Sequence, residues 1–157
     1  MSIEYVSIWL MSQSDAEEIA SWKYEGPYSF YNAENDLEDL EELLSEKARG
    51  SNYYSVKDSN QNLIGFFSFL FHKNEAVIGL GLAPHLTGQG IGLDFVNRGI
   101  NYIENNFSNI NKVNLSVAAF NERAIKVYKK AKFKTVSTYM QRTNGSEYPF
   151  IKMERTL

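Results

Sequence analysis

Hydrophobic residues follow two patterns in the middle of this chain, a continuous apolar run and a helical repeat of three to four residues. Residues 77–82 are an apolar run that lacks the polar alternation of a half-exposed strand, which favours a buried strand. Pro84 cannot donate to a sheet, so this strand should end at Ala83. After a glycine-rich turn, apolar residues three or four positions apart predict one face of a helix. They are Leu93, Val96, Ile100, Ile103 and Phe107.

The same reading extends over the rest of the chain. Further strands are expected at residues 3–10, 53–57, 63–71 and 112–118, and on both sides of a turn at residues 143–146. Further helices are expected from Ser14 to near Trp22, from Asn35 to about Ala48, and over residues 121–131. The first two helices open with Ser or Asn followed three residues later by Glu, a capping-box pattern. Meanders followed by strand–helix–strand units predict a mixed α/β sheet of about seven strands with about four flanking helices.

Composition narrows the class of protein. The chain has 157 residues, 43% of them hydrophobic, which predicts one globular domain over residues 1–157. The net charge is −3 without a long basic run, so nucleic acid is not expected as a partner. The absence of cysteine excludes disulfides, thiolate metal sites and a cysteine nucleophile. No signal peptide or membrane span is visible at the acidic N-terminal segment, so a cytoplasmic location is expected, with no metal.

The glycine-rich turn at residues 87–92 is a candidate anion site. It follows a strand and precedes a helix whose first N–H groups have no intrahelical partner, and small residues let a phosphate approach the backbone. A nucleotide P-loop would need Lys and Ser or Thr after the last glycine, where Leu93 and Asp94 stand. A dinucleotide fingerprint would need a third glycine at Leu93. The spacing therefore predicts a phosphate-bearing ligand of another kind.

The turn resembles the acyl-CoA-binding motif of the GNAT superfamily of N-acyltransferases, Gln/Arg-x-x-Gly-x-Gly/Ala. The sequence from Thr87 to Gly92 matches it at both final glycines, and Thr87 departs from its first position. A second segment resembles the family pattern Asn-x-x-Ala-x-x-x-Tyr-x-x-x-Gly-Phe. It begins at Asn121, and Lys132 replaces its glycine at a position that should be left-handed. The predicted order of elements is also the GNAT order, so the resemblance covers nearly the whole chain.

The resemblance implies a GNAT-like fold and an N-acetyltransferase that takes its acetyl group from acetyl-CoA and passes it to a primary amine by direct attack. Leu82 would stabilise the oxyanion through its backbone N–H, and Tyr128 would act as the general acid. Leu80 and Leu82 would pair with the pantetheine arm. The full set of residues expected to bind acetyl-CoA is Leu80, Leu82, Thr87, Gly88, Gln89, Gly90, Ile91, Gly92, Asn121, Ala124 and Tyr128.

The general base and the acceptor are less defined. Glu25, Glu75, His85 and Glu122 all border the expected site, and none is chosen as the base. In the family, the segment between the first two helices lines the acceptor pocket, and here it is rich in aromatic rings that suit a cationic amine. The expected acceptor-binding residues are Trp22, Tyr24, Glu25, Tyr28 and Tyr31. The acceptor is a small-molecule or peptide amine, and the chain is expected to act as a monomer or homodimer.

Alternative interpretations stay open at this point. Asn121 is also a preferred N-cap residue, Tyr128 also fits a buried core tyrosine, and the aromatic rings also fit a satellite hydrophobic cluster. A different function would be an acyl-CoA-binding sensor without turnover, in which removing the Tyr128 hydroxyl changes nothing. A nucleotide-binding module is a third function and would prefer ATP or NAD to CoA.

Overall fold

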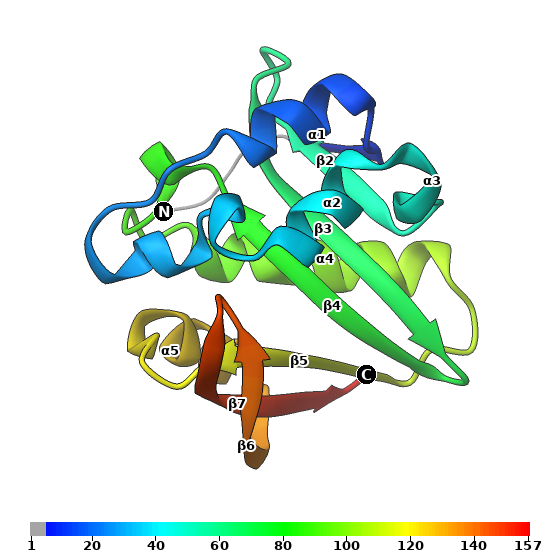
Figure 1. Ribbon diagram of the computed structural model, residues 1–157. Coiled ribbons are helices and arrows are strands. Elements are labelled where there is room, and N and C mark those ends of the chain that lie inside the picture. The colour runs from blue at the N-terminus through cyan, green and yellow to red at the C-terminus, as the bar shows by residue number, and fades with distance from the viewer. Residues whose placement is uncertain (1–5) are drawn as a thin grey trace.

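The computed structural model describes residues 6–157, which form a seven-stranded mixed sheet in the order β1-β2-β3-β4-β5-β7-β6 (Figure 1). The strands are β1 (Ser7–Leu10), β2 (Tyr53–Lys57), β3 (Leu63–His72), β4 (Glu75–Leu82), β5 (Lys112–Ala118), β6 (Lys134–Thr143) and β7 (Ser146–Thr156). Among the strands described in residues 6–157, only β4 and β5 pair in parallel, and the other neighbouring strands are antiparallel. This confirms the predicted mixed sheet, although part of the strand expected at residues 3–10 lies outside the described residues.

The helices cover both faces of the sheet. They are α1 (Gln13–Ala20), α2 (Leu37–Leu44), α3 (Glu46–Arg49), α4 (Gly92–Asn106) and α5 (Glu122–Lys130), with short 3-10 helices η1 (Gly26–Tyr31), η2 (Ala33–Asn35) and η3 (Pro84–Leu86). Figure 1 shows α1, α2 and α3 in front of the sheet and α4 behind it. No helix in residues 6–157 is both long and apolar enough to cross a membrane.

The first helices differ in detail from the prediction. The N-cap of α1 is Ser12, not Ser14, and that of α2 is Asp36, not Asn35. The Asp36 carboxylate accepts from the Asp39 N–H at 3.2 Å, while the amide of Asn35 donates to the Ser29 carbonyl at 2.7 Å. The helix expected to continue to about Ala48 breaks at Ser45, whose backbone is extended and whose hydroxyl accepts from the N–H three residues later. Serine competes for backbone donors in this way, so it ends α2 and starts α3.

The apolar stripe predicted for α4 is confirmed. Val96, Ile100 and Ile103 are almost fully buried against the back of the sheet. Helix and sheet approach closely, because a methyl group on Gly99 would lie 2.6 Å from the ring of Phe67. This packing holds α4, and therefore the turn before it, in a set position on β3 and β4.

Strands β4 and β5 separate part of the way along their length. Their parallel pairing covers Glu75, Ala76 and Val77 on β4 and ends at the pair Val77 and Asn114. Beyond that point β4 continues to pair with β3 alone, and β4 and β5 diverge (Figure 1). The last half of β4 therefore has one edge without a neighbouring strand.

The hairpin between β6 and β7 reaches across to the segment that precedes α2. As predicted, its turn is formed by Asn144 and Gly145, both with positive φ. The hydroxyl of Thr143 donates to Asp36 at 2.5 Å, and the amide of Asn144 donates to the Phe30 carbonyl at 2.6 Å. These contacts join the end of the chain to its first third beside the opening between β4 and β5.

Candidate active site

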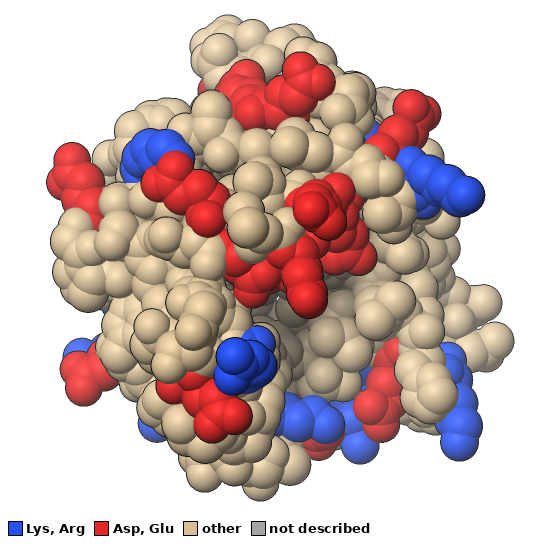
Figure 2. Space-filling model, in the orientation of Figure 1, with Lys and Arg blue, Asp and Glu red and all other residues tan. Residues whose placement is uncertain are grey.

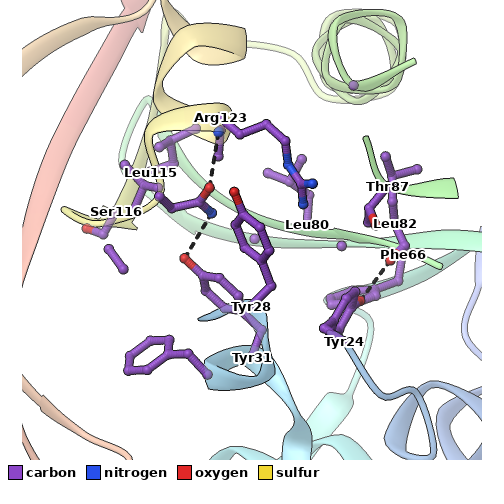
Figure 3. Close-up of a pocket in the computed structure, with 18 of the residues that line it drawn as sticks. Tyr24, Tyr28, Tyr31, Phe66, Leu80, Leu82, Thr87, Leu115, Ser116 and Arg123 are labelled. Carbon is purple, nitrogen blue, oxygen red and sulfur yellow. Dashed lines mark hydrogen bonds between the residues drawn. The ribbon is translucent and has the colours of Figure 1, made fainter. Parts of the chain in front are cut away.

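A cavity of about 840 Å³ lies where β4 and β5 separate (Figure 3). It is lined by β4 and β5, by α5 and the glycine turn on one side, and by η1 and α2 on the other. It brings together most of the residues singled out in the sequence. Those that line it are Trp22, Tyr24, Tyr28, Tyr31, Leu80, Leu82, Thr87, Gly88, Gly90, Gly92, Asn121, Ala124 and Tyr128.

The unpaired edge of β4 faces this cavity with its main-chain groups. The N–H of Ala83 donates to β3, at the Ile64 carbonyl, at 2.9 Å. Because main-chain groups alternate along a strand, those of Leu80 and Leu82 point the other way, toward the gap left by β5. The Tyr24 hydroxyl donates to the Leu82 carbonyl at 2.7 Å, which agrees with that direction (Figure 3). An extended ligand could therefore bind along this edge, with the Leu82 carbonyl already occupied by Tyr24.

The glycine turn has the backbone geometry of an anion site. Gly88 and Gly90 have φ of +73° and +78°, values that side chains disfavour. The N-cap of α4, Ile91, makes no side-chain capping bond. The backbone N–H groups of residues 88–93 donate no hydrogen bond to any group within residues 6–157. Unsatisfied donors at a helix N-terminus suit the diphosphate of a CoA molecule, so the residues present fit this ligand.

Tyr128 lies on α5 at the cavity wall, and its phenol is held in the protonated form. Burial, with a smaller contribution from nearby Tyr31, raises the pKa of Tyr128 well above its usual value. The phenol therefore carries its proton at neutral pH, as a general acid must, and the same shift makes it a weaker acid than a free tyrosine. Asn121 begins the same helix: its side-chain oxygen accepts from the Ala124 N–H at 3.1 Å, and its amide donates to Tyr31 at 3.0 Å. Asn121 is therefore an N-cap, and it also joins α5 to the aromatic segment.

Three predicted binding residues have side chains that do not line the cavity. Glu25 is exposed, Gln89 donates its amide to the His85 carbonyl at 2.6 Å, and Ile91 is buried in the core. Ile91 and Gln89 can contribute only backbone N–H groups to a ligand there.

The four candidates for the base are also absent from the cavity lining. Glu75 lies at the closed end of β4 and β5, where Lys112 is 3.5 Å away, and His85 and Glu122 are exposed. Glu25 is on the surface as well. In the described residues the only carboxylates that line the cavity are Asp36 and Asp39.

These two aspartates were not identified from the sequence. They belong to the acidic N-terminus of α2, and Figure 2 shows acidic side chains gathered over α2 beside a hollow in the surface. The hydrogen bond from Thr143 lowers the pKa of Asp36, whereas burial and the neighbouring carboxylates raise that of Asp39. Capping patterns marked this segment as a helix start, but only its packing against the hairpin turns it toward the cavity.

Arg123 is a further cavity residue that the sequence did not single out. It follows Asn121 by two positions, and its guanidinium carbon lies 4.0 Å from the centre of the Tyr28 ring (Figure 3). With Lys130, it gives the α5 side of the cavity positive charge, opposite the acidic α2 side.

The buried phenols should make the folded protein sensitive to alkali. Burial raises the pKa of Tyr24 to about 12 and raises the pKa values of Tyr53 and Tyr128 further. Unfolded tyrosines ionise near pH ~10, so the folded state binds these protons more tightly and loses stability as the pH rises above that value. Urea unfolding measured from about pH 8 to 11 should show constant stability up to about pH 10 and a decline above it. Tyr24→Phe should make the decline shallower; an unchanged slope in this variant would contradict the assignment.

The comparisons with known proteins agree with this geometry. Residues 7–134 match the family model described as an acetyltransferase (GNAT) domain. The chain therefore belongs to the GNAT acetyltransferase family and is an N-acetyltransferase that moves an acetyl group from acetyl-CoA to a primary amine. No protein of curated function matches the chain.

Solved structures share the fold. A chimera of the spermidine N-acetyltransferase SpeG of Vibrio cholerae and hSSAT has a TM-score of 0.77 and 22% identity, over 96% of this chain and 95% of that one. The V. cholerae spermidine N-acetyltransferase in complex with CoA and spermine has a TM-score of 0.75, with the same identity and coverage. At this identity the likeness extends to the fold, and the predicted GNAT-like architecture is confirmed.

Proposed function

We propose that acetyl-CoA and a cationic amine enter this cavity from opposite sides and react directly where they meet. The observation that carries the proposal is the free edge of β4, which faces a cavity reaching both the glycine turn and the acidic start of α2. Arg123 and Lys130 on one side suit an anionic cosubstrate, and Asp36 and Asp39 on the other suit a cation.

The proposal gives a role in the reaction to several residues that line the cavity. Acetyl-CoA supplies an activated acetyl thioester. The N–H groups of the glycine turn would hold its diphosphate, and the main chain of Leu80 and Leu82 would align its pantetheine arm. The Leu82 N–H would stabilise the oxyanion, and Tyr128 would give its proton to the departing sulfur as the carbon–sulfur bond breaks. The attacking nitrogen would lose one proton to solvent water, from which the Tyr128 phenol is protonated again. Tyr24 would hold the aromatic segment between α1 and α2 against β4 through its hydrogen bond to the Leu82 carbonyl.

We further propose that the acceptor is a small amine with more than one positive charge. Burial, followed by repulsion from Asp36, Glu42 and Glu38, raises the pKa of Asp39, and a bound ammonium group would relieve that repulsion. The aromatic rings of Trp22, Tyr24 and Tyr28 offer cation–π contacts in the same cavity. A V. cholerae relative of the same fold was crystallised with spermine, which supports a polyamine as the acceptor class.

The test is release of free thiol from acetyl-CoA in the presence of polyamines, monoamines and short peptides. We expect polyamines to be the best acceptors, and Asp39→Asn to raise their KM by about fivefold with little change for a monoamine, as for loss of one partly exposed charge contact. Glu41→Gln is the matched control, because Glu41 is exposed on the same helix and does not line the cavity. Equal effects of both variants, or preference for peptides, would contradict a polyamine acceptor.

We also propose that the chain acts in the cytoplasm as one domain, as a monomer or homodimer. The absence of cysteine from the 157 residues supports a reducing compartment. The net charge of −3 gives no support for a nucleic-acid partner.

A further inference from the structure

The glycine turn has no positive charge of its own. The Thr87 hydroxyl donates to the Pro84 carbonyl at 2.8 Å, and the Gln89 amide is engaged by the His85 carbonyl. The turn therefore offers only neutral N–H groups to a diphosphate that carries two negative charges. Thr87 also stands where the acyl-CoA motif has Gln or Arg. A cation supplied from elsewhere in the fold would strengthen binding at this place.

Arg123 reaches the turn from α5. A methyl group built on Gly88 would lie 3.3 Å from its Nη1 atom, so the guanidinium occupies the space beside Gly88. Its other contact is the face of the Tyr28 ring, and within residues 6–157 it makes no ion pair with a carboxylate. Figure 3 shows the side chain extending from α5 across the cavity, with Tyr28 beneath it.

The position of Arg123 is set by its helix. It lies in the first turn of α5, two positions after the N-cap Asn121, whose side chain is hydrogen-bonded both to Ala124 and to Tyr31. The stacked Tyr28 ring limits the orientations of the guanidinium while leaving its in-plane donors available. A planar fork of donors beside a turn rich in free N–H groups matches the geometry of a phosphate group.

We propose that Arg123 is the cationic anchor for the diphosphate of acetyl-CoA, acting in place of the side chain that Thr87 does not provide. The inference rests on the proposed cofactor site and adds a specific residue to it. It also gives Gly88 a second constraint, because a side chain there would meet the guanidinium as well as a positive φ of +73°.

The experiment is a binding titration, which does not depend on turnover. CoA, 3′-dephospho-CoA and pantetheine are titrated into wild type, Arg123→Gln, Arg123→Lys and Lys129→Gln, with NMR shifts used for the weaker ligand. Lys129→Gln is the matched control, since it removes one charge from the exposed side of the same helix, outside the cavity lining. We expect Arg123→Gln to weaken CoA and 3′-dephospho-CoA by about tenfold, and pantetheine and the control by less than about twofold.

The outcomes separate this inference from the proposed function. Wild type that does not bind CoA would overturn both. Wild type that binds CoA, with Arg123→Gln unchanged, would overturn the role of Arg123 alone. An equal loss for pantetheine would mean a structural effect, and a loss seen only with the 3′-phosphate would place the contact elsewhere; either overturns the assignment. If Arg123→Gln fails to fold, Arg123→Lys carries the test, with an expected loss of about threefold because the charge stays and the fork is lost.

Discussion

Replacing Tyr128 by phenylalanine should lower kcat by about 10²- to 10⁴-fold, the usual range for loss of a general acid. The phenol lines the cavity from α5, and its raised pKa keeps it protonated at the pH where an amine reacts. Without that proton the thiolate would have to leave unassisted. The ring itself packs edge-on against Phe133, a contact that phenylalanine preserves. The effect should therefore fall on the chemical step and not on folding.

The measurement is steady-state kinetics together with a titration of acetyl-CoA. The Kd should change by less than about twofold, because one cavity hydroxyl contributes little to binding the whole cosubstrate. Tyr102→Phe is the control, since Tyr102 is half-buried on α4 outside the cavity lining. A Tyr128→Phe enzyme with full kcat would remove Tyr128 from the mechanism. Wild type that binds acetyl-CoA but acetylates no amine would instead favour the sensor.

Replacing Gly90 by valine should weaken acetyl-CoA binding by about 100-fold or more. Gly90 has φ of +78° and lines the cavity, so a β-branched residue must distort the turn and displace its N–H groups. Loss of two hydrogen bonds to a charged group, at about 1.5 kcal/mol each, corresponds to that change in Kd.

Gly145→Val is a closely matched control for this variant. Gly145 has φ of +76°, and a methyl group there, as on Gly90, would meet nothing within 4 Å, but it lies in the hairpin turn outside the cavity lining. Both variants should lose about 1–2 kcal/mol of stability from the same backbone strain. Only Gly90→Val should lose acetyl-CoA binding. If the two variants bound equally well, the glycine turn would not be the diphosphate site.

The parts of the site that the sequence predicted are those written in contiguous residues. The strand, the turn and the start of α4 follow one another along the chain, as do Asn121, Ala124 and Tyr128 at helical spacing. Local rules suffice for such segments, because the strand, the glycine turn and the helix each depend on neighbours a few residues away. The positive φ of Lys132 at the end of α5 was expected for the same reason.

The predictions that the structure corrected concern the choice among several polar residues in one segment. Asp36, not Asn35, became the N-cap of α2, and the helix expected to reach Ala48 was interrupted at Ser45. Glu25 was expected near the acceptor and is exposed, while Asp36 and Asp39 line the cavity instead. Each outcome depends on which of several equivalent polar residues finds a partner, and periodicity carries no information about that choice.

By itself, then, the sequence determined the order and type of the elements, the glycine turn and the two motifs that indicate an acyl-CoA-dependent acetyltransferase. Only the tertiary structure decided where β4 leaves β5, that the hairpin carrying Thr143 closes against Asp36, and that Arg123 reaches Gly88 from another helix. The physical reason is range. Hydrophobic period and turn chemistry act over a few residues, whereas the cavity is made by contacts between segments up to 114 positions apart, such as Phe30 with Asn144. Such partners become neighbours only when the core has packed.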